Sequence, residues 1–132
     1  MYDNNFDGSL PPTLGSGMKA LTNLAIDHCE LGGTIPESLG SAISLYSVVL
    51  GENQLVGTVP ASLAGLKKLE VLSLESNQLS GVPPPLHWQE YDAMCDMTGN
   101  NFTCPCKDQA SCRSDANWMS ARKHCNATCH YA

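Results

Sequence analysis

The fold is decided by the stretch "ENQLVGTVP", Glu52 to Pro60, because it returns almost unchanged as "SNQLSGVP" from Ser76 to Pro83. A looser copy, "HCELGGTIP", precedes both. With the copies in register, aligned aliphatic residues lie 24 positions apart at Leu21, Leu45 and Leu69, at Leu24, Val48 and Leu72, and at Ile26, Leu50 and Leu74. A repeat of roughly 20 to 29 residues predicts a solenoid, in which every copy forms one coil of a stack.

Each copy predicts one short strand, because aliphatic residues alternate with other residues where the copy begins. The alternation is seen in Leu24-Ala25-Ile26 and again in Leu72-Ser73-Leu74. Successive side chains of a strand point to opposite faces, so the aliphatic residues point into the coil and the intervening residues point outward. Strands of successive coils are expected to lie side by side and form a parallel sheet.

A polar residue follows each strand, at the point where the chain turns away from the sheet. This residue is Asn53 in one coil and Asn77 in the next, and Cys29 takes the position in the coil before them. A buried amide can satisfy backbone donors and acceptors that have no strand partner, so we expect the two asparagines to form a ladder. A thiol tolerates burial, so Cys29 is interpreted as a structural cysteine outside any disulfide. The segments "GTIP", "GTVP" and "GVP" are expected to turn the chain and close each coil.

The repeats extend beyond these three copies. The segment "NNFDGSLP", Asn4 to Pro11, matches the second half of a repeat, and "CDMTGNNF", Cys95 to Phe102, matches a last, degenerate strand. We therefore predict repeats over residues 1–91, with a partial first coil that upstream coils and a leader would complete. Residues 92–132 are predicted to hold the last strand and a C-terminal cap.

The stretch "LYSVVLGENQLVGTVPASLA", Leu45 to Ala64, resembles the plant-type leucine-rich repeat of receptor-kinase ectodomains and polygalacturonase inhibitor proteins. It is also similar to the repeats of some protist surface antigens, and the resemblance covers about residues 4–105. It implies an α/β solenoid with a parallel sheet on its concave side. It further implies a non-enzymatic module that binds a protein, peptide or glycan through that side.

Composition and charge favour a soluble folded chain that does not bind nucleic acid. The chain has 42% hydrophobic and 15% charged residues, and its net charge is −6. Residues 1–91 hold nine acidic and three basic side chains, whereas residues 92–132 hold four of each. Phosphate contacts need clustered lysine and arginine, which this distribution does not provide. No apolar run in the sequence approaches the ~18 residues of a membrane-spanning helix.

The C-terminal segment is rich in cysteine. It contains Cys95, Cys104, Cys106, Cys112, Cys125 and Cys129. An even number in a short segment predicts a disulfide framework, for which fifteen connectivities remain open. A zinc site is the alternative, but the matched C-x2-C pairs typical of structural zinc are absent, so we expect no metal. The sequons at Asn101 and Asn126 lie among these cysteines, and together they predict a glycosylated protein on the secretory route, either secreted or at the cell surface.

The tail also contains a candidate helix that could cap the solenoid. In "SDANWMSARKHC", Ser114 or Asp115 can cap the N-terminus, and Trp118, Ala121 and Cys125 share one side. A solenoid otherwise exposes the apolar cross-section and strand edge of its last coil. We expect this helix, held by disulfides, to cover that end.

No set of catalytic residues is evident. The sequence contains no P-loop, no H-E-x-x-H and no G-x-S-x-G motif, and its four histidines are scattered. An exposed sheet without a cleft is a poor scaffold for catalysis. The chain is therefore predicted not to be an enzyme and to need no cofactor.

The outward residues of the strands are the candidate binding residues. Those with chemistry suited to recognition are Asp27, His28, Val49, Glu52, Ser73, Glu75 and Asp96. Four strands of about five residues make a sheet on the order of 300 Å², whereas a specific interface takes ~800 Å² from each partner. Further coils, or contacts repeated in an assembly, are expected to supply the remaining area.

Two alternatives remain open. In the first, the chain is a structural glycoprotein of a wall, sheath or surface filament, which self-associates through its open N-terminal coil near Phe6 and Leu10. In the second, the hydroxyl column of Ser9, Thr34 and Thr58 orders ice.

Overall fold

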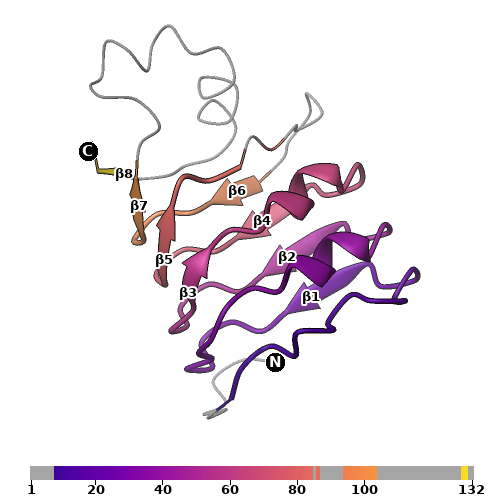
Figure 1. The fold of residues 1–132 in the computed structure, drawn as a ribbon, viewed down its shortest axis with the longest axis horizontal. Coiled ribbons are helices and arrows are strands. Elements are labelled where there is room, and N and C mark those ends of the chain that lie inside the picture. The colour runs from indigo at the N-terminus through magenta and orange to yellow at the C-terminus, as the bar shows by residue number, and fades with distance from the viewer. Residues whose placement is uncertain (1–7, 85, 87–93, 104–128, 131–132) are drawn as a thin grey trace, which may run out of the picture.

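The computed structural model describes residues 8–84, 86, 94–103 and 129–130 of the 132-residue chain, and the description below is confined to them. The coils stack side by side into a short solenoid (Figure 1). The elements are β1 (Asn23–Ala25), η1 (Glu37–Ser41), β2 (Ser47–Val49), β3 (Val56–Thr58), η2 (Ala61–Gly65), β4 (Val71–Ser73), β5 (Gln78–Gly81), β6 (Met94–Asp96), β7 (Asn101–Thr103) and β8 (Cys129–His130). The predicted solenoid with a parallel sheet is confirmed.

The first sheet has the order β1-β2-β4-β6, and all its pairs are parallel. Its register follows the repeat, since Leu24 pairs with Val48, Val48 with Leu72, and Leu72 with Cys95. Each strand spans three residues instead of the five expected. Backbone pairing nevertheless continues beyond the strands, because the N–H of Ile26 donates to the carbonyl of Val49 at 2.9 Å.

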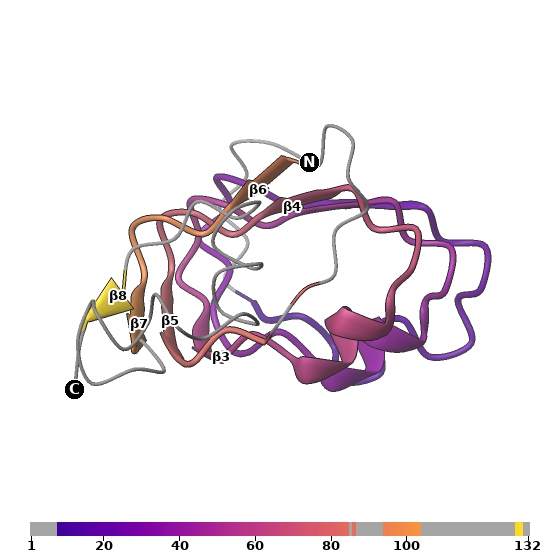
Figure 2. The ribbon, with the colours of Figure 1, turned by 90° about the horizontal axis from the view of Figure 1, so that it is seen from above.

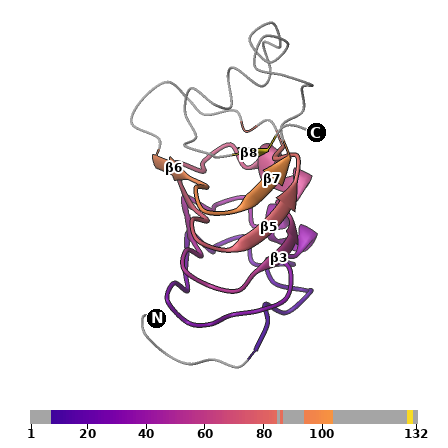
Figure 3. The same cartoon turned by 90° about the vertical axis from the view of Figure 1, so that its left-hand side faces the viewer.

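A second parallel sheet, with the order β3-β5-β7-β8, was not predicted from the sequence. It lies along a different side of the coils from the first sheet (Figure 3). The strand β3 overlaps the segment "GTVP", and β5 ends at the glycine of "GVP". Both segments were interpreted as turns alone because glycine and proline disfavour strands. Here the glycine belongs to a short strand and takes a positive φ, which is 81° at Gly57 in the middle of β3 and 73° at Gly81 at the end of β5. The proline follows the strand and ends it.

On the third side, two successive coils each carry a short 3-10 helix. Both η1 and η2 begin directly after a proline, Pro36 or Pro60. The hydroxyl of Ser62 donates to the carbonyl of Glu37 at 2.7 Å and so ties η2 to the preceding coil. Seen from above, the two sheets and the helices surround each coil's interior (Figure 2). The helices of the described residues are thus 3-10 helices, and neither has the length and apolar character needed to cross a membrane.

The interior is a continuous aliphatic core shared by successive coils. The leucine columns supply most of it, and Leu45, Leu50, Leu72 and Leu74 are 0% exposed. Leu24 of the first strand is only partly buried, although it packs against the same core. Fully burying one such side chain stabilises a protein by about 1.5–3 kcal/mol. The core therefore runs through the stack and depends on neighbouring coils being present.

An asparagine ladder runs beside the core, as predicted. The Oδ1 atom of Asn77 accepts from the N–H of Leu55 at 3.0 Å, and its Nδ2 atom donates to the carbonyls of Leu50 and Leu74 at 2.9 and 3.1 Å. Asn53 makes the corresponding bonds one coil earlier, and Asn100 makes them one coil later. Each amide therefore joins its own coil to the preceding one.

The described residues test only part of the cysteine predictions. Cys29 is buried and reduced, and its thiol contacts the carbonyl of Asp27 at 3.0 Å. Cys95 is disulfide-bonded. The other predicted disulfide cysteines, the sequon at Asn126 and the helix around Trp118 lie outside the described residues, apart from the backbone of Cys129 in β8. The composition of the cap therefore stays a prediction.

Replacing Asn77 by alanine tests the ladder. The change leaves a buried N–H and buried carbonyls without hydrogen-bond partners, so we expect the free energy of unfolding to fall by about 2–4 kcal/mol. The exposed neighbour provides the control, since Gln78→Ala should change stability by less than about 0.5 kcal/mol. Urea unfolding of both variants with disulfides intact measures this. Equal losses for the two variants would contradict the assigned role of the amide.

Candidate functional site

The candidate site is the outward face of the first sheet, which we call the concave face. Its rows follow the strand register: Asn23, Ser47, Val71 and Met94; then Ala25, Val49, Ser73 and Asp96; then Asp27, Gly51, Glu75 and Thr98; and then His28, Glu52, Ser76 and Gly99. The first two rows follow strand pairing and the others follow backbone hydrogen bonds. All seven predicted binding residues lie in these rows, which hold four carboxylates and no lysine or arginine.

His28 links the first two coils at one end of the concave face. Its Nδ1 lies 3.1 Å from Oδ2 of Asp27, and its Nε2 lies 2.8 Å from Oε2 of Glu52. The side chains of His28 and Glu52 are 44% and 52% exposed, so solvent screens this contact and its contribution to stability is small. His28 and Glu52 also share a left-handed backbone, with φ of 53° and 51°. The residues of the last row therefore lie in a turn that follows the strands.

Glu75 takes its position from a glycine in the neighbouring strand column. Its Oε2 accepts a hydrogen bond from the hydroxyl of Ser73 at 2.5 Å. A Cβ atom at Gly51 would collide with the carboxylate of Glu75, so the missing side chain leaves room for it. Gly51 was not among the binding residues predicted from the sequence, although a glycine in an otherwise polar row was an available signal.

Asp96 is held by its own strand end. Its Oδ1 accepts hydrogen bonds from the backbone N–H of Thr98 at 2.9 Å and from the hydroxyl of Thr98 at 2.7 Å. Asp96 and Glu75 are both half-buried, and neither forms an ion pair within the described residues. Both carboxylates are thus fixed in place by neutral hydroxyl or amide donors.

Apolar residues gather at the other end of the same strands. Met94 is 70% exposed and lies opposite Val71 in the first row. Tyr46, directly before β2, is also exposed, and a hydrogen bond to the Glu70 carboxylate raises the pKa of its phenol, with the carboxylate's charge and slight desolvation adding to the effect. Of the apolar residues of the concave face, sequence analysis placed only Val49 among the binding residues. Met94 was not predicted as a binding residue, although a methionine at an outward strand position was a signal in the sequence.

A cavity of about 380 Å³ lies between β4 and β6 on the concave face. Val71 and Met94 line one end, and Ser73, Glu75 and Asp96 line the other. It therefore has an apolar end and an acidic end on one pair of strands. Within the described residues, no group of three or more histidine, cysteine, aspartate or glutamate side chains is arranged to hold a metal ion.

The hydroxyl column proposed for ice binding is not formed on the second sheet. Thr34 bridges to Val56, and Thr58 pairs with Ser80. Paired residues of β3 and β5 are 22 positions apart, whereas the repeat is 24, so the second sheet slips by two residues per coil. Thr34 and Thr58 therefore belong to different rows. The repeat period alone could not reveal this slip.

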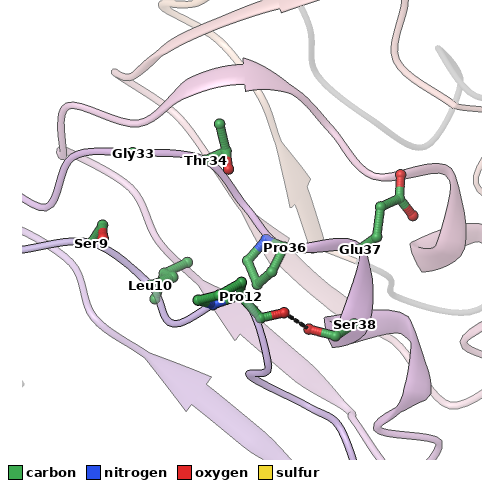
Figure 4. A pocket seen from close by; sticks show the side chains of 8 residues that line it. All are labelled: Ser9, Leu10, Pro12, Gly33, Thr34, Pro36, Glu37 and Ser38. Carbon is green, nitrogen blue, oxygen red and sulfur yellow. Dashed lines mark hydrogen bonds between the residues drawn. The ribbon is translucent and has the colours of Figure 1, made fainter.

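A second cavity, of about 420 Å³, lies between the first two coils near η1. Leu10, Pro12 and Pro36 form an apolar part of its lining, and Ser9, Thr34 and Glu37 add polar groups (Figure 4). The hydroxyl of Ser38 is already used, since it donates to the carbonyl of Pro12 at 2.7 Å. This cavity lies away from the concave face.

The fold and the concave face define a leucine-rich repeat solenoid, and comparisons with known proteins agree. Residues 20–42 and 68–89 match the family model "Leucine Rich Repeat". Receptor-like protein 31 of Arabidopsis thaliana is 42% identical over 48 residues, which are 36% of this chain and 6% of that protein. The matched segments are leucine-rich repeats, and the chain is similar to plant-type leucine-rich repeat proteins.

Solved structures extend the likeness. The BIR3–SERK2 complex of Arabidopsis thaliana contains a chain that is 31% identical to this one in sequence, and the two superpose with a TM-score of 0.68. The match covers 79% of this chain and 55% of that chain. The leucine-rich repeat ectodomain of the Arabidopsis thaliana receptor kinase GASSHO1/SCHENGEN3, solved with CASPARIAN STRIP INTEGRITY FACTOR 2, is 29% identical with a TM-score of 0.65. That match covers 78% of this chain and 12% of the ectodomain chain. The chain thus spans about half or less of these relatives.

Two glycines allow contacts between neighbouring coils to be tested, one against Glu75 and one against Thr34. Gly51→Ala should displace the Glu75 carboxylate and break its bond to Ser73, but cost less than about 1 kcal/mol, because that side chain can move. Gly57→Ala should cost about 1–2 kcal/mol, since φ is 81° and the methyl group of Thr34 lies 3.1 Å from the new Cβ. Urea unfolding and a crystal structure of Gly51→Ala measure both effects. An unmoved Glu75 would contradict this account.

Proposed function

We propose that this chain is a non-enzymatic extracellular recognition module that binds a peptide or an extended protein segment through its concave face. The observation that carries the proposal is the aligned rows of half-exposed polar and apolar side chains on β1, β2, β4 and β6. Such a face offers a partner regularly spaced contacts on a rigid backbone. Positioned side chains on regular elements cost less to order on binding than side chains on loops.

The similar proteins also support recognition of a polypeptide. The similar ectodomain GASSHO1/SCHENGEN3 was solved in complex with a factor, and BIR3 and SERK2 form a complex with one another. We infer that recognition of a polypeptide is also the role of this chain, with a secreted or cell-surface location. A glycan ligand lacks an equivalent observation, as does a structural role in a wall or filament.

The C-terminal part completes the proposed module. Residues 92–132 would form the last strand and a disulfide-rich cap around Cys95. Asn101 is exposed on β7 of the second sheet, so a glycan attached there would leave the concave face open. This division leaves residues 1–91 to carry most of the binding face.

A binding experiment tests the proposal. A random peptide library displayed on phage is selected on the full chain, and the selected sequences are measured as free peptides by calorimetry. The double variant Glu52→Gln with Glu75→Gln should weaken binding by about tenfold or more, because it removes charges from the centre of the concave face. Val49→Arg, which places a bulky cation there, should abolish binding.

The matched control changes the same charge elsewhere. Glu30→Gln with Glu37→Gln removes two exposed carboxylates outside the rows of the concave face and should leave affinity unchanged. Peptides that bind the parent chain and both concave-face variants with equal affinity would show that the binding surface lies elsewhere.

A further inference from the structure

The cavity between β4 and β6 has features that select one kind of side chain. Val71 and Met94 are opposite one another at its apolar end. Asp96 lies two residues further along β6, at the acidic end, and Glu75 lies beyond Ser73 on the neighbouring coil. Two residues along a strand span about 7 Å. The cavity is thus an apolar trough that ends at two carboxylates.

The acidic end has no positive charge of its own within the described residues. The ion pairs of the described residues join His28 to Asp27 and Glu52, outside the cavity, and neither Glu75 nor Asp96 takes part. The described lysines, Lys19, Lys67 and Lys68, belong to the loops that precede β1 and β4. A cation from a partner would therefore meet two carboxylates that no basic side chain of residues 8–84, 86 and 94–103 neutralises.

Both carboxylates are held in place before any partner arrives. Ser73 donates to Oε2 of Glu75, while Thr98 donates through its N–H and its hydroxyl to Oδ1 of Asp96. No described residue donates a hydrogen bond to Oε1 of Glu75 or to Oδ2 of Asp96. Fixed acceptors bind a charged donor with less loss of side-chain entropy.

An arginine or lysine side chain satisfies both ends of the cavity at once. Each has a stem of methylene groups that packs on apolar surface while its charged head stays at a polar site. An acidic side chain would meet like charge, and a purely aliphatic one would leave the carboxylates facing apolar surface. We propose that this cavity receives a basic side chain of the bound polypeptide, with the stem on Val71 and Met94 and the head at Glu75 and Asp96.

This inference rests on the proposed function, so the experiment separates the two. Peptides selected on the full chain are first sorted by their sensitivity to Val49→Arg, which blocks the concave face outside the cavity. For each sensitive peptide, every arginine is replaced in turn by citrulline and every lysine by norleucine. The affinities of parent and substituted peptides are then measured on the wild-type chain and on Glu75→Gln with Asp96→Asn.

The expected result is a coupling between one basic residue and the two carboxylates. Replacing that basic residue by its neutral counterpart should weaken binding to the wild-type chain by about tenfold. The same replacement should weaken binding to the double variant by less than about threefold, because the two carboxylates are already neutral there. On the comparison variant Asp27→Asn with Glu52→Gln, whose carboxylates lie outside the cavity, the tenfold effect should persist. Urea unfolding checks that each variant is folded.

A second variant keeps the test open if the carboxylate substitutions destabilise the chain. Met94 is 70% exposed, so Met94→Ser should leave the fold intact. It should weaken the basic peptide about threefold or more, but it should hardly affect a peptide in which the basic residue is replaced by alanine, because alanine has no stem to pack on this residue. Equal losses for the basic peptide and the alanine peptide would overturn the assignment of the stem to this residue.

The remaining outcomes are distinct. Some outcomes would overturn the cavity proposal and leave the proposed function standing. One is that no neutral replacement of an arginine or lysine weakens a concave-face peptide, and the other is that such a replacement weakens binding equally on the wild-type chain and on every variant. A selection in which no peptide responds to Val49→Arg would overturn the proposed function, and the cavity proposal with it.

Discussion

The structure depends on an asparagine amide that bonds to two coils at once. A single coil has too few aliphatic residues to form a core alone, so its leucines are buried only when a neighbour packs on them. The amide of Asn53 accepts from the N–H of Leu31 and donates to the carbonyl of Ile26, both in the preceding coil. These bonds satisfy buried backbone groups just where the strand ladder ends, and they fix how far one coil can shift along the next.

That fixed register determines the surface as well as the core. Because Leu72 must lie over Val48, Ser73 must lie beside Val49, and every outward side chain has a set neighbour. One consequence is that Gly51 lies beside Glu75, whose carboxylate fills the space that a side chain at position 51 would occupy. A second is the placement of Met94 opposite Val71, which creates the apolar end of the cavity. The arrangement of the concave face is therefore set by the same constraint that buries the leucines.

The sequence predicted the first sheet and its rows because both follow from a strict repeat. It did not predict the second sheet, since the pairing of Thr58 with Ser80 slips by two residues against that repeat. It also placed the predicted binding residues on the outward face of the first sheet, where the structure has them, without predicting their contacts. Whether His28 turns toward Glu52, or Ser73 toward Glu75, depends on left-handed turns and on side-chain space in the next coil. Such information lies between coils, and a column of residue types does not contain it.

The small size of the concave face constrains how it could bind. Four strands at ~4.8 Å spacing offer an area on the order of 300 Å², far below the ~800 Å² that a typical interface takes from each partner. Area is a poor measure of affinity, however, because a few deeply placed side chains supply most of the binding energy of an interface. A cavity with one apolar and one charged end suits that mode, since Glu75 and Asp96 are already oriented by their hydrogen bonds. A short solenoid of this kind would then recognise its partner through one anchored side chain, while the flat rows around it exclude water and set the direction of the chain.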